Sequence, residues 1–476
     1  MALNTSHPFL NKSTLEYELP DFSLIRDDHY LPAFYAGFEE QTAEIQAIID
    51  QSQTTFENTI VALERSGQLL KRVNLVFSNI SSSDATSSIR AIESEISPQL
   101  TAHMDSIFLN PALFARVESL YQDRQGLDLD SEGLNLLEKY YKDFIQAGAH
   151  LDDAKRTEIR SINKELSTLQ SEFAQKLLED SNQLAVVVED PSELDGLSEG
   201  EISSCATAAN ETGYAGKYLV PAVNFTGHPL LASLKNRELR RKVMENSLIK
   251  GARGNDYDTR AILLQMARLR AKRAKLFGFA THAEYVLNKS TAKNPANVHA
   301  MLRKIAPAAV RNAGAEAHDL QEIIGDGFEL TSWDWDFYTE QVRKAKYDLD
   351  TEAMRPYFEL ENVLHKGVFY AANKLFGLQF KARPDLKAYH PEARVFEVFN
   401  EDGSKLALYI ADFYARPTKR GGAWMNSLVT QNYLLDQYPV VVNNLNIPKP
   451  ASGEPTLLTL DNTTTLFHEF GHALHG

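Results

Sequence analysis

The sequence predicts a mainly helical protein with one small β-sheet placed directly before a C-terminal helix. Three observations lead to this fold class. Residues 151–182 carry an apolar stripe at helical spacing, the composition becomes strand-like near residue 394, and the chain then ends in a second apolar-patterned helix. The 476 residues are 43% apolar and 24% charged, as in ordinary soluble globular proteins.

The helical region begins early. Residues 54–78 place apolar side chains near helical spacing, and Thr54 or Thr55 can cap the start. Residues 151–182 give the clearest pattern, because apolar residues step by three or four and the positions between them are polar (Ile159, Ile162, Leu166, Leu169, Phe173, Leu177). We expect one long amphipathic helix packed within a helical lobe. Residues 184–188 and 217–225 should be short extended pieces.

Charge excludes some partners. The chain has 49 basic and 64 acidic residues, a net charge of −15. Nucleic acids and anionic membranes need a basic surface, so we expect neither as a partner. The basic residues of 258–277 fit a solvated helix face. Cys205 is the one cysteine, and we expect an inert thiol. No signal peptide or membrane span is evident, which favours the cytoplasm, or the periplasm if a leader was removed.

Strands follow near residue 394. The runs Val395–Phe399 and Leu406–Phe413 flank a turn containing Asp402-Gly403. Further extended pieces are expected at 421–425 (GGAWM), 439–447 (PVVVNNLNI) and 456–460 (TLLTL). Together they predict a small mixed or antiparallel sheet beside the last helix. We set the boundary between the helical region, 1–390, and this second region, 391–476.

The chain ends in LFHEFGHALHG. His468 and His472 lie four residues apart, so in a helix they share one face and can bind one zinc ion. Glu469 is rotated away from them, where its carboxylate can reach a water on the metal, and we predict that it is the general base. The structural alternative is two histidines at the core edge with a solvated glutamate. We expect His475 at the surface.

The residues around the motif indicate a partly buried helix. Four of them are apolar (Leu466, Phe467, Phe470, Leu474), Asp461 or Asn462 can cap its start, and Gly471 suggests that another group packs closely there. An edge strand beside such a helix can hold a peptide by backbone pairing. We expect either Leu406–Phe413 or the residues Gly421, Gly422, Ala423 and Trp424 to border that groove, because glycines allow close backbone approach.

Several blocks resemble the thimet-oligopeptidase family of zinc metallopeptidases, and within it the bacterial dipeptidyl carboxypeptidases. They include TFENTIVALERSGQLL at 55–70, SWDWDFYTEQVRKAKYDLD at 332–350, KPASGEPTLL at 449–458 and TLFHEFGHALHG at 465–476, and the similarity runs along the whole chain. The resemblance implies zincin-type helical lobes around a deep channel, with residues 1–390 forming one wall and the roof. It also implies one Zn²⁺ bound by His468 and His472, catalysis by Glu469, and short unstructured peptides as substrates of a monomer.

The sequence departs from the family pattern at its end. The family's third zinc ligand is a glutamate after HExxH, and its substrate-binding residues follow, so we expect them beyond Gly476. Asp461 and Glu454 are poorly placed to replace that ligand. We therefore expect a fragment with little or no activity of its own. The predicted function is release of C-terminal dipeptides. The alternatives are an oligopeptidase A-type endopeptidase and, in another class, an inactive peptide-binding protein.

Overall fold

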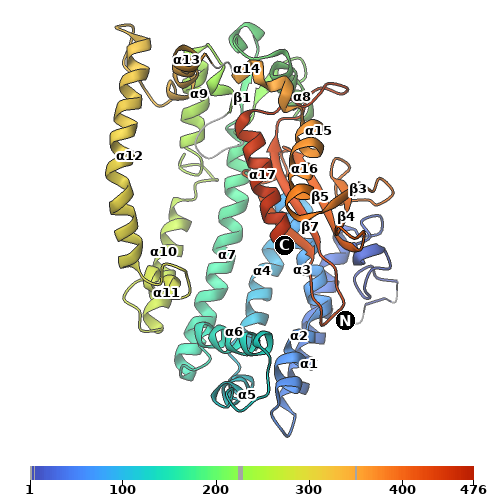
Figure 1. Ribbon diagram of the computed structural model, residues 1–476. Coiled ribbons are helices and arrows are strands. Elements are labelled where there is room, and N and C mark those ends of the chain that lie inside the picture. The colour runs from blue at the N-terminus through green and yellow to red at the C-terminus, as the bar shows by residue number, and fades with distance from the viewer. Residues whose placement is uncertain (1–2, 5, 223–228, 349–350) are drawn as a thin grey trace.

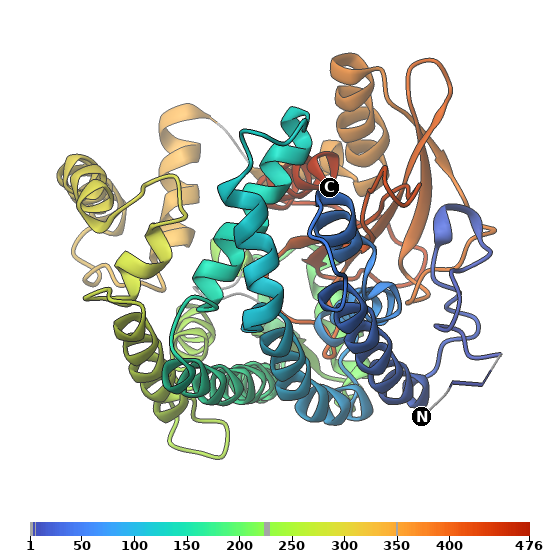
Figure 2. The same cartoon turned by 90° about the horizontal axis from the view of Figure 1, so that it is seen from below.

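The computed structural model describes residues 3–4, 6–222, 229–348 and 351–476. Its helices form an elongated body in which α7 (Asp153–Gln183) runs lengthwise (Figure 1). The main β-sheet and α12 (Pro295–Ile324) lie on opposite sides of α7, and the view from below shows the same separation (Figure 2). The mainly α fold with a small sheet beside the last helix is confirmed.

Six α-helices precede α7 in the described part of the chain, and α4 packs against it. Their bounds are α1 (Tyr30–Ile49), α2 (Ala62–Arg65), α3 (Gln68–Ser83), α4 (Ser87–Phe108), α5 (Pro111–Gln122) and α6 (Ser131–Ala147), with a π-helical turn at Glu57–Val61. The helical pattern of 54–78 is present but interrupted. Gly67 adopts a left-handed conformation (φ 68°), which ends α2 and starts α3. Thr55 does cap the segment, exchanging hydrogen bonds with Asn58.

The long amphipathic helix is confirmed as α7. It buries Ile159, Ile162 and Leu166 and packs against α4 and α10 (Arg260–Leu276), so its stripe serves packing within one lobe. In α10, Arg268 and Lys272 are exposed, as expected of a solvated basic face. Among the described residues, no helix is both long and apolar enough to cross a bilayer.

A second group of elements follows α7. The predicted extended pieces form an antiparallel pair, β1 (Val186–Val188) and β2 (Tyr218–Val220). The end of the second piece, 223–225, lies outside the described residues. Besides α10 and α12, the helices of this part are α8 (Glu199–Glu211), α9 (Arg237–Leu248), α11 (His282–Leu287), α13 (Trp335–Tyr347) and α14 (Thr351–Met354).

The main sheet has the order β3-β4-β5-β7-β6. Its strands are β3 (Gln379–Ala382), β4 (Arg394–Phe399), β5 (Lys405–Tyr414), β6 (Trp424–Val429) and β7 (Val440–Ile447). β5 and β7 are parallel and the other pairs antiparallel, so the sheet is mixed. β3 precedes the boundary that we set at residue 390. TLLTL is not a strand, because Leu457 makes only an isolated bridge to Glu359 and Leu460 already begins α17 (Leu460–His475).

The sheet is covered on both faces. One face joins α1, α3 and α4 in a single core, through residues such as Phe34, Val73, Leu408 and Val442. The other face carries α15 (Leu360–Asn362), a π-helical segment at Val363–Phe369, α16 (Tyr370–Phe376) and α17. The last helix is therefore seated on a sheet that the N-terminal helices support from behind.

Candidate functional site

The helix that carries the histidine motif begins with a side-chain cap. Thr459 accepts a hydrogen bond from the Asn462 backbone N–H at 3.0 Å, and the Asn462 side chain accepts one from the Thr459 N–H at 3.3 Å. This capping box fixes the first turn of α17. The cap that we predicted, Asp461 or Asn462, was thus placed too late, and Asn462 takes the reciprocal role.

The apolar residues of α17 divide between two environments. Leu466 and Phe470 are buried against the sheet, with exposed fractions of 0% and 4%, whereas Phe467 and Leu474 are each 40% exposed. A methyl group added at Gly471 would meet nothing within 4 Å. The close packing expected around Gly471 is therefore wrong, because this glycine lies on the open side of the helix.

The two histidines lie on that open side. Their Nε2 atoms approach to 3.1 Å, and both side chains are exposed. Two nitrogens bound to one tetrahedral zinc at about 2.0–2.1 Å would be about 3.3–3.4 Å apart. The pair is thus arranged as two ligands of one metal would be, and the predicted helix and shared face are present. Their role as zinc ligands stays a prediction.

Glu469 lies on the buried side of the helix, with 6% of its surface exposed. Its Oε2 atom is buried and has no hydrogen-bond partner in the described structure. A buried carboxylate oxygen without a partner is costly unless a bound group satisfies it. Glu469 follows His468 in the sequence, and its unsatisfied oxygen fits a site in which a bound water or substrate group completes the hydrogen bonding.

Other candidate ligands are not gathered here. Within the described residues, no group of three or more His, Cys, Asp or Glu side chains is close enough to hold a metal. Asp461 is exposed in the first turn of α17, and Glu454 is exposed before it. His475 is exposed at the end of the helix, as predicted.

The predicted peptide-binding segment leads into the last strand of the sheet. Gly421, Gly422 and Ala423 precede β6, and Trp424 begins it. Among the described strands β6 pairs only with β7, so its other edge has no strand partner. The alternative, Leu406–Phe413, is wrong as a groove border because β5 is paired on both sides. Whether residues 421–424 bind peptide stays a prediction.

A buried ionic cluster anchors this segment, and the sequence analysis missed it. Asp412 has a fully buried side chain and accepts hydrogen bonds from Arg416 at 2.9 and 2.7 Å and from Lys419 at 3.0 Å. Burial lowers the pKa of Lys419 to about 8. The sequence feature that could have indicated this cluster is Asp412 itself, an acidic residue within the apolar strand run ALYIADFYA. The cluster fixes residues 416–419, immediately before Gly421.

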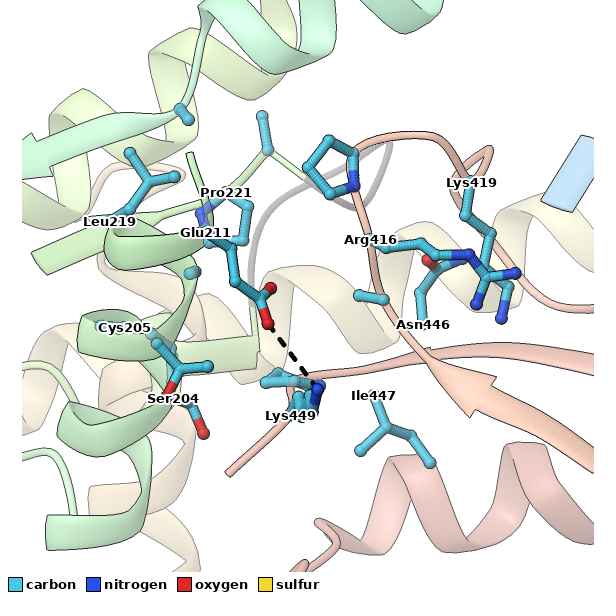
Figure 3. Close-up of a pocket in the computed structure, with 18 of the residues that line it drawn as sticks. Ser204, Cys205, Glu211, Leu219, Pro221, Arg416, Lys419, Asn446, Ile447 and Lys449 are labelled. Atoms are coloured by element: carbon cyan, nitrogen blue, oxygen red, sulfur yellow. Dashed lines mark ion pairs between the residues drawn. The ribbon is translucent and has the colours of Figure 1, made fainter. Parts of the chain in front are cut away.

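A cavity of about 990 Å³ lies at the N-terminal end of α17. Figure 3 shows residues of α8 on one wall, including Cys205 and Glu211, and Arg416, Asn446 and Lys449 opposite. Lys449 reaches Glu211 across it, at 3.7 Å. Gly421 and Thr459 also line the cavity, but the histidine pair does not. Burial raises the pKa of the Cys205 thiol to about 12, consistent with an inert cysteine.

Comparison with known proteins agrees with this geometry. The model of "Peptidase family M3" matches residues 230–476. Along its whole length the chain is 42% identical to the dipeptidyl carboxypeptidase of Escherichia coli (strain K12), of which it covers 70%. It is 40% identical to the Salmonella typhimurium dipeptidyl carboxypeptidase, covering 70% of that protein. Identity to the oligopeptidase A of Haemophilus influenzae is 27%, over 99% of this chain and 70% of that protein.

The family match spans the sheet, the segment before β6 and the whole of α17. M3 peptidases are generally zinc metallopeptidases, in keeping with two histidines converging beside a buried glutamate. The chain belongs to peptidase family M3, and it is a peptidase.

Proposed function

We propose that this peptidase is a zinc peptidyl-dipeptidase, which releases dipeptides from the C-terminus of short unstructured peptides. The observation that carries the proposal is the 3.1 Å approach of the His468 and His472 Nε2 atoms beside Glu469. The similarity to two bacterial dipeptidyl carboxypeptidases supports the substrate class. The acidic surface and single cysteine are compatible with a cytoplasmic monomer that binds neither nucleic acid nor membranes.

In this proposal the chain's own residues divide the work. His468 and His472 hold the zinc, which when bound acts as a Lewis acid toward a carbonyl and makes water more acidic. Glu469 accepts the proton of the attacking water and returns it to the leaving amine. Its carboxylate starts from a buried position, where a nearby charge is screened less than in bulk water.

The peptide would lie along the edge of β6 that has no strand partner. Gly421 and Gly422 let another backbone approach, and Asn446 fixes their segment by donating to the carbonyls of Arg420 and Gly422, at 2.9 and 2.7 Å. An extended peptide can add to such an edge through main-chain hydrogen bonds. Folded proteins lack a free extended segment of that kind, so short peptides are the expected substrates.

An endopeptidase of the oligopeptidase A type is the second candidate, supported by the 27% identity to that group. The two activities differ in their need for a free C-terminal carboxylate. Amidation of a peptide's C-terminus should abolish cleavage by a peptidyl-dipeptidase and leave an endopeptidase active. The two peptides should be compared at equal length and sequence.

Glu469→Gln tests the proposed chemistry. Glutamine keeps the shape of the side chain but cannot take a proton, so hydrolysis should be lost while zinc remains bound. Zinc content and dipeptide release from an N-terminally blocked peptide are the measurements. Zinc loss in the variant, or substantial turnover, would contradict the assigned role.

The 476-residue chain itself should bind zinc weakly and turn over slowly. Two histidines are fewer protein ligands than the three of a usual catalytic zinc site, and the described residues place no third beside them. An inactive peptide-binding protein would bind the same peptides with no turnover at any zinc concentration. One tightly bound zinc with sustained turnover would show that these residues suffice.

A further inference from the structure

Asn443 is a buried polar residue on an otherwise apolar surface. It lies in β7 with no exposed area, on the face of the sheet that carries α17. Its strand neighbours on this face are Val441 and Leu445, and its partners across the sheet are Ala411 and Met425. Packing alone would favour an apolar side chain at this position.

The Asn443 side chain has one partner in the described structure. Its Nδ2 donates to the backbone carbonyl of Glu469 at 2.8 Å, while its Oδ1 is buried without a partner. Within an α-helix the same carbonyl also accepts the N–H four residues later. Asn443 thus adds a second hydrogen bond to the backbone of the proposed general base.

We propose that Asn443 is a positioning residue that fixes α17 on the sheet at Glu469, and with it the place of the buried Glu469 side chain. The inference rests on the proposed function, because it assumes the roles given there to Glu469 and the histidines. The apolar residues with which α17 packs on the sheet, such as Leu466 and Phe470, make contacts that have little directional preference. A hydrogen bond is directional, so it sets the rotation and axial position of the helix at Glu469.

A positioning role for Asn443 and a purely structural role predict different effects of its substitution on the melting temperature. The unpartnered Oδ1 is destabilising, so leucine, which branches at Cγ as asparagine does, should leave the melting temperature unchanged or raise it. The histidines are both on α17, and their spacing within the helix does not depend on Asn443. Glu469 shares that helix, but its side chain is buried whereas the histidines are exposed. A shift of α17 on the sheet should therefore change the surroundings that hold the Glu469 carboxylate, and weaken any ligand that needs this carboxylate as a hydrogen-bond acceptor.

The test uses the full chain at a zinc concentration that saturates it and acetohydroxamate as a probe, with binding of the probe to free zinc subtracted. A hydroxamate chelates zinc and presents an O–H to a neighbouring carboxylate, so its affinity reports the position of Glu469 without requiring turnover. Asn443→Leu should lower acetohydroxamate affinity at least tenfold, with zinc affinity within twofold of the parent chain. Glu469→Gln should lower acetohydroxamate affinity similarly. Val441→Leu, on the same strand and face, should bind the probe as the parent does.

Two results separate the inference from the proposed function. If Glu469→Gln weakens the probe and Asn443→Leu does not, Asn443 has no positioning role and the proposed function stands. If Glu469→Gln leaves the probe unaffected, the role of Glu469 fails, and the inference fails with it. A lower melting temperature or loss of zinc in Asn443→Leu would make Asn443 a structural residue and would also overturn the inference.

Discussion

The Asp105 carboxyl group is buried between α4 and α7. It accepts hydrogen bonds from Asn163 Nδ2 at 2.9 and 3.1 Å, but burial dominates and raises its pKa to about 6. An acid whose pKa is raised on folding binds more protons in the folded state between about pH 4 and 6. Stability therefore falls as the pH rises through this window, and the penalty is complete above it.

Asp105→Asn should remove that penalty. We expect the free energy of unfolding at pH 7 to rise by about 2 kcal/mol, because no charge has to be buried. This is somewhat less than the raised pKa alone implies, since an amide accepts fewer hydrogen bonds from Asn163 than a carboxylate does. The gain should disappear near pH 4, where the aspartate is protonated. Urea unfolding at both pH values measures this, with the exposed Asp326→Asn as control. An equal gain at both pH values would show that the carboxylate's charge is not the cause.

At the residue scale, the sequence predicted which side chains lie together when they share one helix. It did not predict the side chains that the sheet brings together. The spacing of His468 and His472 required only helix geometry. Asn443 and Asp412 are polar residues inside apolar runs, and nothing local indicates their partners. Asn443 meets a backbone 26 residues away, and the partners of Asp412 depend on how the chain turns after β5.

The last helix gives two stability predictions of opposite sign. Gly471→Ala should raise the free energy of unfolding by about 1 kcal/mol, because its position is open and alanine favours the helix. Thr459→Ala should lower it by about 1 kcal/mol, because the cap is lost. Urea unfolding of both variants is the measurement. A destabilised Gly471→Ala chain would mean that another group packs against the open face.

Elements with strong periodicity were predicted well, and their ends less so. The apolar stripe of α7 fixed both its type and its length, and Asp402-Gly403 located the turn between β4 and β5. Gly67 broke a predicted helix because a glycine can adopt the left-handed conformation that ends one. TLLTL has strand composition, but the Thr459 cap starts α17 within it. Local capping chemistry outweighed strand propensity there.

At the scale of the whole molecule, distant segments support the site. The backbone N–H of Ala85 donates to the carbonyl of Thr418 at 2.8 Å, and that of Arg420 to Ser82 at 2.9 Å. The end of α3 therefore fixes the segment before Gly421, more than 330 residues later. The sequence predicted a helical region and a sheet, but not that one core would join them. Long-range pairing of this kind leaves no periodic pattern in the sequence.

The central claim is that His468 and His472 together bind zinc, and zinc titration of the purified chain tests it most directly. The parent chain, His468→Ala and His472→Ala are titrated against a competing chelator, with His475→Ala as the matched control from the same helix. We expect each of the first two substitutions to weaken zinc binding at least tenfold and His475→Ala to leave it unchanged. Parent-like zinc affinity in both His468→Ala and His472→Ala would contradict the account.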